Sequence, residues 1–330
     1  MEFDILTGYT IIDGFGFTAL TNPRNVHDTI IVKCDGVSEC ESPQFSVPCH
    51  PIEEYIEIIN KNMLEKAIVI VDDISFLPQC PTLKFLQIVP SYQASSMFDF
   101  SPLYRMPEIL SLNCQNIYGD REQYMSKIDY AKIHGLASLG VSVNEGTINY
   151  NKVETLKTLQ VSGFRGENKD LSDLTCSKNL DTLRLIQCNI SSLNGIEVSH
   201  KMQCLYLDYN RSLYDIGALS RIKETLKVLH IDSCPKIQDF SVLEELEGLE
   251  SLELVGNNTL PDLSFLKKMK NLKRFVFAMN VLDGNLNPCL DVSYVCSLKN
   301  RKHYNLKDCE LPKGVFISRN ESIEEWRRIE

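Results

Sequence analysis

The chain has 330 residues, 43% of them hydrophobic and 24% charged, and a formal net charge of −10 at pH 7. This is a globular composition, long enough for one large or two medium domains. The acidic balance disfavours non-specific nucleic-acid binding, which depends on neutralising phosphates, and mildly favours a basic partner. No stretch approaches the roughly eighteen apolar residues of a membrane-spanning helix.

Residues 1–66 are predicted to form an N-terminal cap or small α+β region. Thr29 to Lys33 has the composition of a strand, and Pro51 to Glu65 that of a helix. Pro51 suits the first helical position. The helix would place its apolar residues on one face: Ile52, Tyr55, Ile56, Ile59 and Met63. Such a region would shield the open edge of the repeats that follow.

A leucine ladder with a period of about 23 residues occupies residues 67–311. Its clearest rungs begin at Leu180, Met202, Leu226 and Leu249, and each matches L-x-x-L-x-L-x-x-N/C. The predicted anchors are Leu86, Leu110, Leu139, Leu159, Leu183, Leu205, Leu229, Leu252, Phe275 and Tyr304, with a degenerate first rung at Ile68 to Asp73. Long intervals at 118–132 and 283–302 are interpreted as insertions.

The ladder predicts an α/β leucine-rich repeat solenoid. Apolar residues at the anchor and two positions later alternate with polar ones, which is the period of a half-buried strand. Each such strand buries its face by stacking on its neighbours. We therefore expect parallel strands on the concave face and short helices or 3-10 turns on the convex side. Asp215, Asp239 and Asp262 are expected to cap those turns.

Small polar residues follow each strand and are expected to hydrogen-bond the buried loop backbone. They are Asn144, Cys188, Asn210, Cys234, Asn257, Asn280 and Cys309. This assignment explains these cysteines without a metal. Glycosylation sequons begin at Asn189, Asn210, Asn257 and Asn320. We interpret them as coincidental, because Asn210 and Asn257 are predicted to be buried.

Residues 312–330 are predicted to form a C-terminal capping helix. Ser322 begins a capping box, and Trp326 and Ile329 provide an apolar pair for docking.

The rungs and the Asp-led return segments resemble those of the internalin-like class of bacterial leucine-rich repeat proteins over about residues 83–311. That resemblance implies protein binding and specifies no activity. Our leading hypothesis is a non-enzymatic module that binds another protein through the concave face of the solenoid. Within that class, by analogy with leaderless bacterial repeat proteins, an intracellular immunity or inhibitor role against a toxin is one candidate. Two alternatives stay open: a secreted or cell-surface recognition protein whose leader was removed, and an enzyme with its site in the N-terminal region.

No catalytic, cofactor-binding or metal site is predicted. Cys34, Cys40, Cys49 and His50 offer four possible zinc ligands but lack the close pair of cysteines typical of zinc knuckles. The six histidines have no nucleophile signature around them, and the chain has no glycine-rich phosphate loop. Twelve dispersed cysteines and a start without a secretory signal favour reduced thiols and a cytoplasmic location.

The predicted partner-binding residues lie on the outward positions of the central strands. Parallel stacking at about 4.8 Å per strand would gather them into one patch. They are Arg184, Tyr206, Asp208, Tyr209, His230, Asp232 and Glu253. Aromatic area beside carboxylates would suit a protein partner with a basic surface. Metal binding or catalysis by His230 with Asp232 is the less favoured interpretation.

Overall fold

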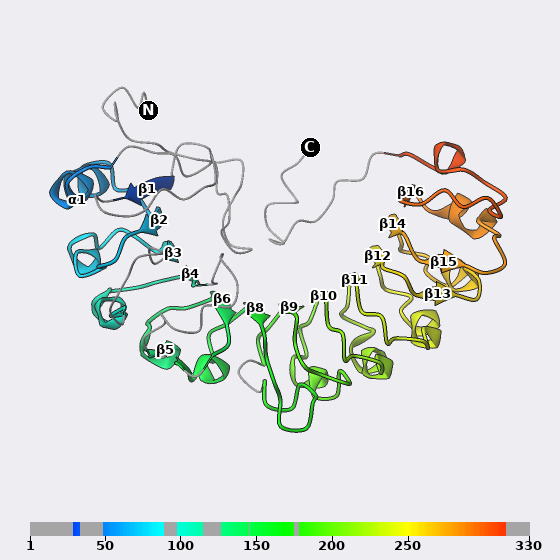
Figure 1. The fold of residues 1–330 in the computed structure, drawn as a ribbon, viewed down its shortest axis with the longest axis horizontal. Coiled ribbons are helices and arrows are strands. Elements are labelled where there is room, and N and C mark those ends of the chain that lie inside the picture. Colours follow the sequence, from blue (N-terminus) through cyan, green and yellow to red (C-terminus); the bar gives the residue numbers. More distant parts are fainter. Residues whose placement is uncertain are drawn as a thin grey trace. The chain divides into compact units, whose positions relative to one another are not determined.

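The computed structural model describes residues 29–33, 49–88, 98–114, 127–144, 146–174 and 178–314. Twelve strands form one parallel sheet in chain order, as the labels in Figure 1 show. They are β1 (Thr29–Lys33), β2 (Lys66–Ile70), β3 (Phe85–Ile88), β4 (Ser111–Asn113), β6 (Ser138–Ser142), β8 (Thr158–Ser162), β9 (Thr182–Ile186), β10 (Cys204–Asp208), β11 (Val228–Asp232), β12 (Ser251–Val255), β14 (Arg274–Phe277) and β16 (Tyr294–Ser297). One strand per coil confirms the leucine-rich repeat solenoid. The described chain divides into two compact units, with the boundary between Leu156 and Lys157.

The first unit begins with a strand–helix–strand segment. β1 pairs with β2 in parallel, from Thr29 opposite Lys66 to Lys33 opposite Ile70, so the sheet already starts within the segment expected to be a cap. Helix α1 (Ile52–Lys61) connects the two strands and buries Tyr55 and Ile59. The predicted helix is therefore confirmed, although it ends four residues before Glu65.

The rest of this unit repeats a strand and a 3-10 helix. The 3-10 helices are η3 (Leu77–Gln79), η4 (Ser101–Arg105), η6 (Tyr130–Lys132) and η7 (Tyr150–Lys152), with a second, two-stranded sheet of β5 (Ile128–Asp129) and β7 (Thr147–Ile148). Most of the interval 118–132 lies outside the described residues. Its last part forms β5 and η6, which belong to the repeat pattern.

The second unit holds the most regular coils. Its strands carry one inward column that the pairing register aligns from strand to strand: Leu159, Leu183, Leu205, Leu229, Leu252, Phe275 and Val295. Every member is at most 3% exposed. Burial of one such side chain contributes about 1.5–3 kcal/mol. The column is therefore a continuous part of the hydrophobic core of this unit.

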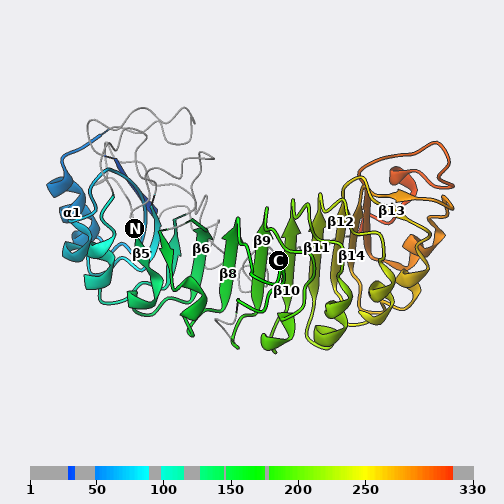
Figure 2. The ribbon, with the colours of Figure 1, turned by 60° about the horizontal axis from the view of Figure 1, so that its bottom comes forward.

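In the second unit, short 3-10 helices connect one strand to the next on the side opposite the sheet (Figure 2). They are η8 (Ile196–Val198), η9 (Gly217–Ile222), η10 (Ser241–Glu245), η11 (Ser264–Lys267), η12 (Asn287–Asp291) and η13 (Asp308–Glu310), with β13 (Thr259–Leu260) paired to β15 (Asn280–Val281). The predicted 3-10 turns are confirmed, but each aspartate stands one residue before the N-cap position. Asp215, Asp239 and Asp262 each accept the backbone N–H two residues later, at 2.8, 2.8 and 2.6 Å.

Two predicted anchors are wrong. Leu112, not Leu110, aligns with Leu86 and Leu139. The error arises because leucines two positions apart satisfy the same strand period. Val295, not Tyr304, is the last anchor. Tyr304 follows the last strand, and its hydroxyl donates to the Met279 carbonyl at 3.2 Å.

The interval 283–302 is consequently not an insertion. It contains η12 and β16, which make a short but complete coil. The rung was missed because valine and serine replace its leucines at Val295 and Ser297.

The polar ladder is confirmed at Cys188, Asn210 and Cys234. Asn210 is fully buried; its Oδ1 accepts the Cys188 N–H at 2.8 Å and its Nδ2 donates to the Leu185 carbonyl at 2.9 Å. The thiols of Cys188 and Cys234 donate to the carbonyls of Val161 and Leu207, each at 3.6 Å. These bonds satisfy backbone groups that the coil would otherwise bury unpaired.

Two other ladder assignments are wrong. Asn257 is exposed, and Asn258 takes the buried position, where it donates to the carbonyls of Cys234 and Ile237 at 3.0 and 2.8 Å. Gly256, with φ of 138°, lengthens this turn by one residue. Cys309 is exposed on η13. Burial therefore excludes a glycan at Asn210 but not at Asn257.

Residues 312–314 border the last strand of the sheet. The Val295 N–H donates to the Pro312 carbonyl at 2.9 Å, and the Gly314 N–H donates to the Ser293 carbonyl at 3.0 Å. The predicted helix from Ser322 lies outside the described residues. Within the described segments, no helix combines the length and apolar composition that crossing a membrane requires.

Candidate protein-binding face

Alternate residues of β9 to β12 point away from the core and form what we call the strand face of the second unit. The pairing register places Tyr206 opposite Arg184 on one side and opposite His230 on the other. Glu253 stands opposite His230 on the next strand. The predicted residues are therefore neighbours because four successive repeats present their outward positions in the same register.

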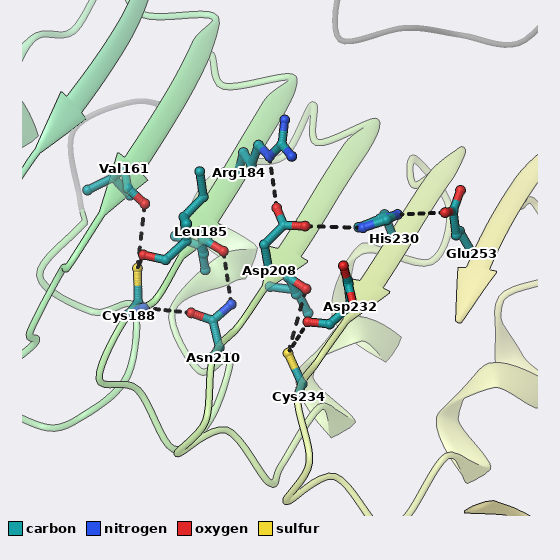
Figure 3. A network of polar contacts seen from close by, with 12 residues as sticks. Val161, Arg184, Leu185, Cys188, Asp208, Asn210, His230, Asp232, Cys234 and Glu253 are labelled. Carbon is teal, nitrogen blue, oxygen red and sulfur yellow. Dashed lines mark hydrogen bonds and ion pairs between the residues drawn. The ribbon is translucent and has the colours of Figure 1, made fainter. Parts of the chain in front are cut away.

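An ion-pair chain crosses this face (Figure 3). Arg184 Nε donates to Asp208 Oδ2 at 2.8 Å, and His230 Nε2 lies 3.1 Å from Asp208 Oδ1. On its other side, His230 Nδ1 lies 3.7 Å from Glu253 Oε1, and Glu253 Oε2 lies 2.8 Å from Arg274 Nη1. Cations and carboxylates therefore alternate across β9, β10, β11, β12 and β14.

The pairing sets the charge of each member. Burial of His230 disfavours its charged form, but its hydrogen bonds to Asp208 and Glu253 and their charges outweigh burial and raise its pKa to about 9. Burial acts to raise the pKa of Asp208, but the bonds and charges of His230 and Arg184 lower it overall. The pKa of Glu253 is lowered in the same way, by His230 and Arg274. His230, Asp208 and Glu253 are therefore charged at neutral pH.

Two tyrosines lie on or beside the ion-pair chain. The Arg184 Cζ lies 5.8 Å from the centre of the Tyr206 ring, and the His230 ring lies 6.0 Å from it. This cation–aromatic packing holds Tyr206 half-buried. Tyr209 directly follows β10 and is 47% exposed. The face therefore offers one fixed aromatic ring and one accessible ring.

Asp232 is the remaining predicted residue. It is half-buried, and its Oδ1 accepts a hydrogen bond from Ser233 Oγ at 2.8 Å. No salt bridge to a cation is found for it within the described part of the chain. It differs in this respect from Asp208 and Glu253, each of which has two cationic partners.

Asp208, His230 and Asp232 also place three metal-ligating atoms within 4.8 Å of one another. The geometry favours ion pairing over metal binding. Arg184 and His230 already engage both oxygens of Asp208, and a protonated imidazole cannot be a ligand. As for the cysteine cluster considered above, Cys34 and Cys40 lie outside the described residues, and His50 pairs with Glu54 at 3.4 Å.

Arg274 is the member of the ion-pair chain that the sequence analysis missed. It stands one position before the anchor Phe275, and the strand period of two places that position on the same face as the residue after the anchor. A search of all outward positions would have found it.

No family model matches the chain, and no curated protein matches it. Similar solved structures include an internalin from Listeria monocytogenes, with 16% identity, 74% of this chain and 76% of that chain covered, and a TM-score of 0.39. A leucine-rich repeat protein from Leptospira interrogans has 10% identity, coverage of 78% and 83%, and a TM-score of 0.37.

The ectodomain of a plant membrane receptor kinase from Arabidopsis thaliana has 17% identity and a TM-score of 0.29, with 70% of this chain and 40% of that chain covered. All three are leucine-rich repeat proteins. The architecture of this chain is established independently by its own strand register and buried ladder.

Proposed function

We propose that this chain is a non-enzymatic protein-binding module that engages its partner through the strand face of the second unit. Solenoids of this kind use the extended surface of their stacked repeats for binding. The observation that supports this face is the ion-pair chain, because it fixes side chains from five strands in one arrangement before any partner arrives. A face held in place loses little conformational entropy on binding.

The partner that we propose is a protein with a basic surface. The ion-pair chain uses the charges of Asp208 and Glu253 internally, so Asp232 is the carboxylate most available to a partner. The net charge of −10 adds attraction over a longer range and would increase the association rate. Tyr206 and Tyr209 supply the aromatic area that binding hot spots favour.

Within this class, we propose an intracellular role as an immunity or inhibitor protein. The cysteines in the described segments are free thiols, including the buried Cys188 and Cys234, which suits a reducing compartment. Cell fractionation tests this location. Recovery of the native protein outside the cell would favour the alternative of an exported recognition protein.

Capture of a partner from cell extract tests the face itself. A triple variant, Tyr206→Ala, Asp208→Ala and Asp232→Ala, should lose most of the capture shown by the native chain. The matched control changes three exposed residues on the loops and 3-10 turns: Tyr214→Ala, Glu244→Ala and Glu245→Ala. It should retain capture. Circular dichroism of both variants checks that the coils remain folded, and equal capture by all three proteins would exclude the strand face.

A further inference from the structure

The residue directly after the strand has a left-handed backbone in five successive repeats. These residues are Gly163, Gln187, Tyr209, Ser233 and Gly256, with φ of 72°, 52°, 56°, 52° and 138°. Each of the first four donates its backbone N–H to a carbonyl at the end of the next strand. In the same order, the acceptors are Ile186, Asp208, Asp232 and Val255, at 2.9, 2.9, 2.9 and 3.1 Å. The conformation is therefore a requirement of the coil at this position.

Tyrosine is the least suited of these five residues to that conformation. Glycine adopts it without steric conflict, whereas positive φ in a bulky residue is an outlier. Packing does not compensate Tyr209, because its side chain is 47% exposed and has no ring or cation contact among the described residues. Strained residues of this kind concentrate at ligand-binding positions.

Asp232 lies beside this tyrosine. The Tyr209 N–H, directly after β10, donates to the carbonyl of Asp232 at the end of β11, so the backbones of the two residues are adjacent. The Asp232 carboxylate accepts the Ser233 hydroxyl and forms no salt bridge with a described cation. The backbones of the two residues are therefore adjacent, one carrying an exposed aromatic side chain and the other a carboxylate that forms no salt bridge with a described cation.

Resting on the function proposed above, we infer that Tyr209 and Asp232 together receive one arginine side chain of the partner protein. A guanidinium group stacks on an aromatic ring and binds a carboxylate through two parallel N–H donors. Lysine offers a point charge without the planar fork. Tyr206 does not take this role, because Arg184 of the same chain already lies 5.8 Å from its ring.

The test is an NMR titration of the full chain, labelled at tyrosine, with three short peptides that are identical except for a central arginine, lysine or citrulline. Citrulline keeps the shape of arginine but removes its charge. We expect the arginine peptide to shift the Tyr209 signals with the highest affinity and the citrulline peptide to leave them unchanged. Equal shifts with citrulline, or tighter binding of lysine, would overturn the inference.

Two variants locate the site. For Asp232→Asn we expect about two- to fivefold weaker arginine-peptide binding, followed at Tyr209, and for Tyr209→Gly a similar loss, followed by calorimetry. Tyr214→Gly, which removes a tyrosine that is 59% exposed, is the control and should change nothing. Unaltered affinity in both variants contradicts the inference. If Tyr209→Gly retains partner capture while the triple variant loses it, only this inference fails; if both retain it, the proposed function fails as well.

Discussion

Replacing Asn210 with alanine should destabilise the second unit strongly, because this buried side chain holds two backbone groups of neighbouring coils. Its amide links two coils, accepting from the Cys188 N–H and donating to the Leu185 carbonyl. Alanine would leave both groups buried without these bonds. An unsatisfied buried group costs about 1–3 kcal/mol, so we expect a loss of about 2–4 kcal/mol in the free energy of unfolding.

A cysteine at the same position should cost less. Cys188 and Cys234 occupy this position in the flanking repeats, and their thiols reach buried carbonyls at 3.6 Å. A thiol donates weakly and is a poor acceptor for the Cys188 N–H, so Asn210→Cys should recover only part of the stability. The expected order of stability is native chain, Asn210→Cys, Asn210→Ala.

Urea unfolding followed by circular dichroism measures this order. A shift of the midpoint at constant slope reports a change in stability, whereas a change in slope would indicate that the coils unfold separately. Asn257→Ala is the control, because that asparagine is exposed and should change stability by less than about 0.5 kcal/mol. Finding Asn210→Ala within that same margin would refute the bridging role of the amide.

Three further predictions follow from the same structure. Tyr209→Gly should raise the free energy of unfolding by about 1 kcal/mol in the urea assay, because glycine adopts the left-handed backbone conformation without strain. A lower free energy of unfolding would show that packing of the Tyr209 ring stabilises the native chain. The pKa of His230 is raised from 6.5 to about 9, so its stabilising contribution is complete below pH 6.5 and is lost as the pH rises through about 9. The pKa values of Asp208 and Glu253 are lowered, so their contribution is present above the ordinary values of 3.8 and 4.5 and is lost as the pH falls. Thermal unfolding from pH 6 to 10 should therefore show a gap between the native chain and His230→Gln that narrows at high pH, and a constant gap would contradict this assignment. Finally, iodoacetamide at neutral pH should label the exposed Cys309 rapidly and leave Cys188 unlabelled until the chain unfolds. The reason is that burial raises the pKa of the Cys188 thiol to about 12. Peptide mass mapping measures the two labelling rates, and equal rates would contradict the burial of Cys188.

The sequence alone determined the architecture of the central repeats and the composition of the strand face. Leucines at fixed spacing, such as Leu183, Leu205 and Leu229, define both the coil length and the inward side of each strand. Once the inward side is known, the period of two assigns the outward residues as well. The candidate patch could therefore be predicted from local pattern without long-range information.

Tertiary structure decided which residue faces the core where the sequence pattern allows two choices, or where a turn contains one extra residue. Leu110 and Leu112 satisfy the same alternation, and only pairing with Leu86 selects between them. The bulge at Gly256 exchanges Asn257 for Asn258, because a single added residue reverses which side chain faces the loop interior.

The charge state of the strand face was also decided by tertiary structure. The sequence suggests an acidic patch with aromatic residues, but in the fold Arg184, His230 and Arg274 pair with Asp208 and Glu253 from neighbouring strands and leave Asp232 without a salt bridge to a described cation. Pairing between residues more than twenty positions apart depends on register and burial. Composition lists the charges, whereas only the stacked coils determine which of them remain available to a partner.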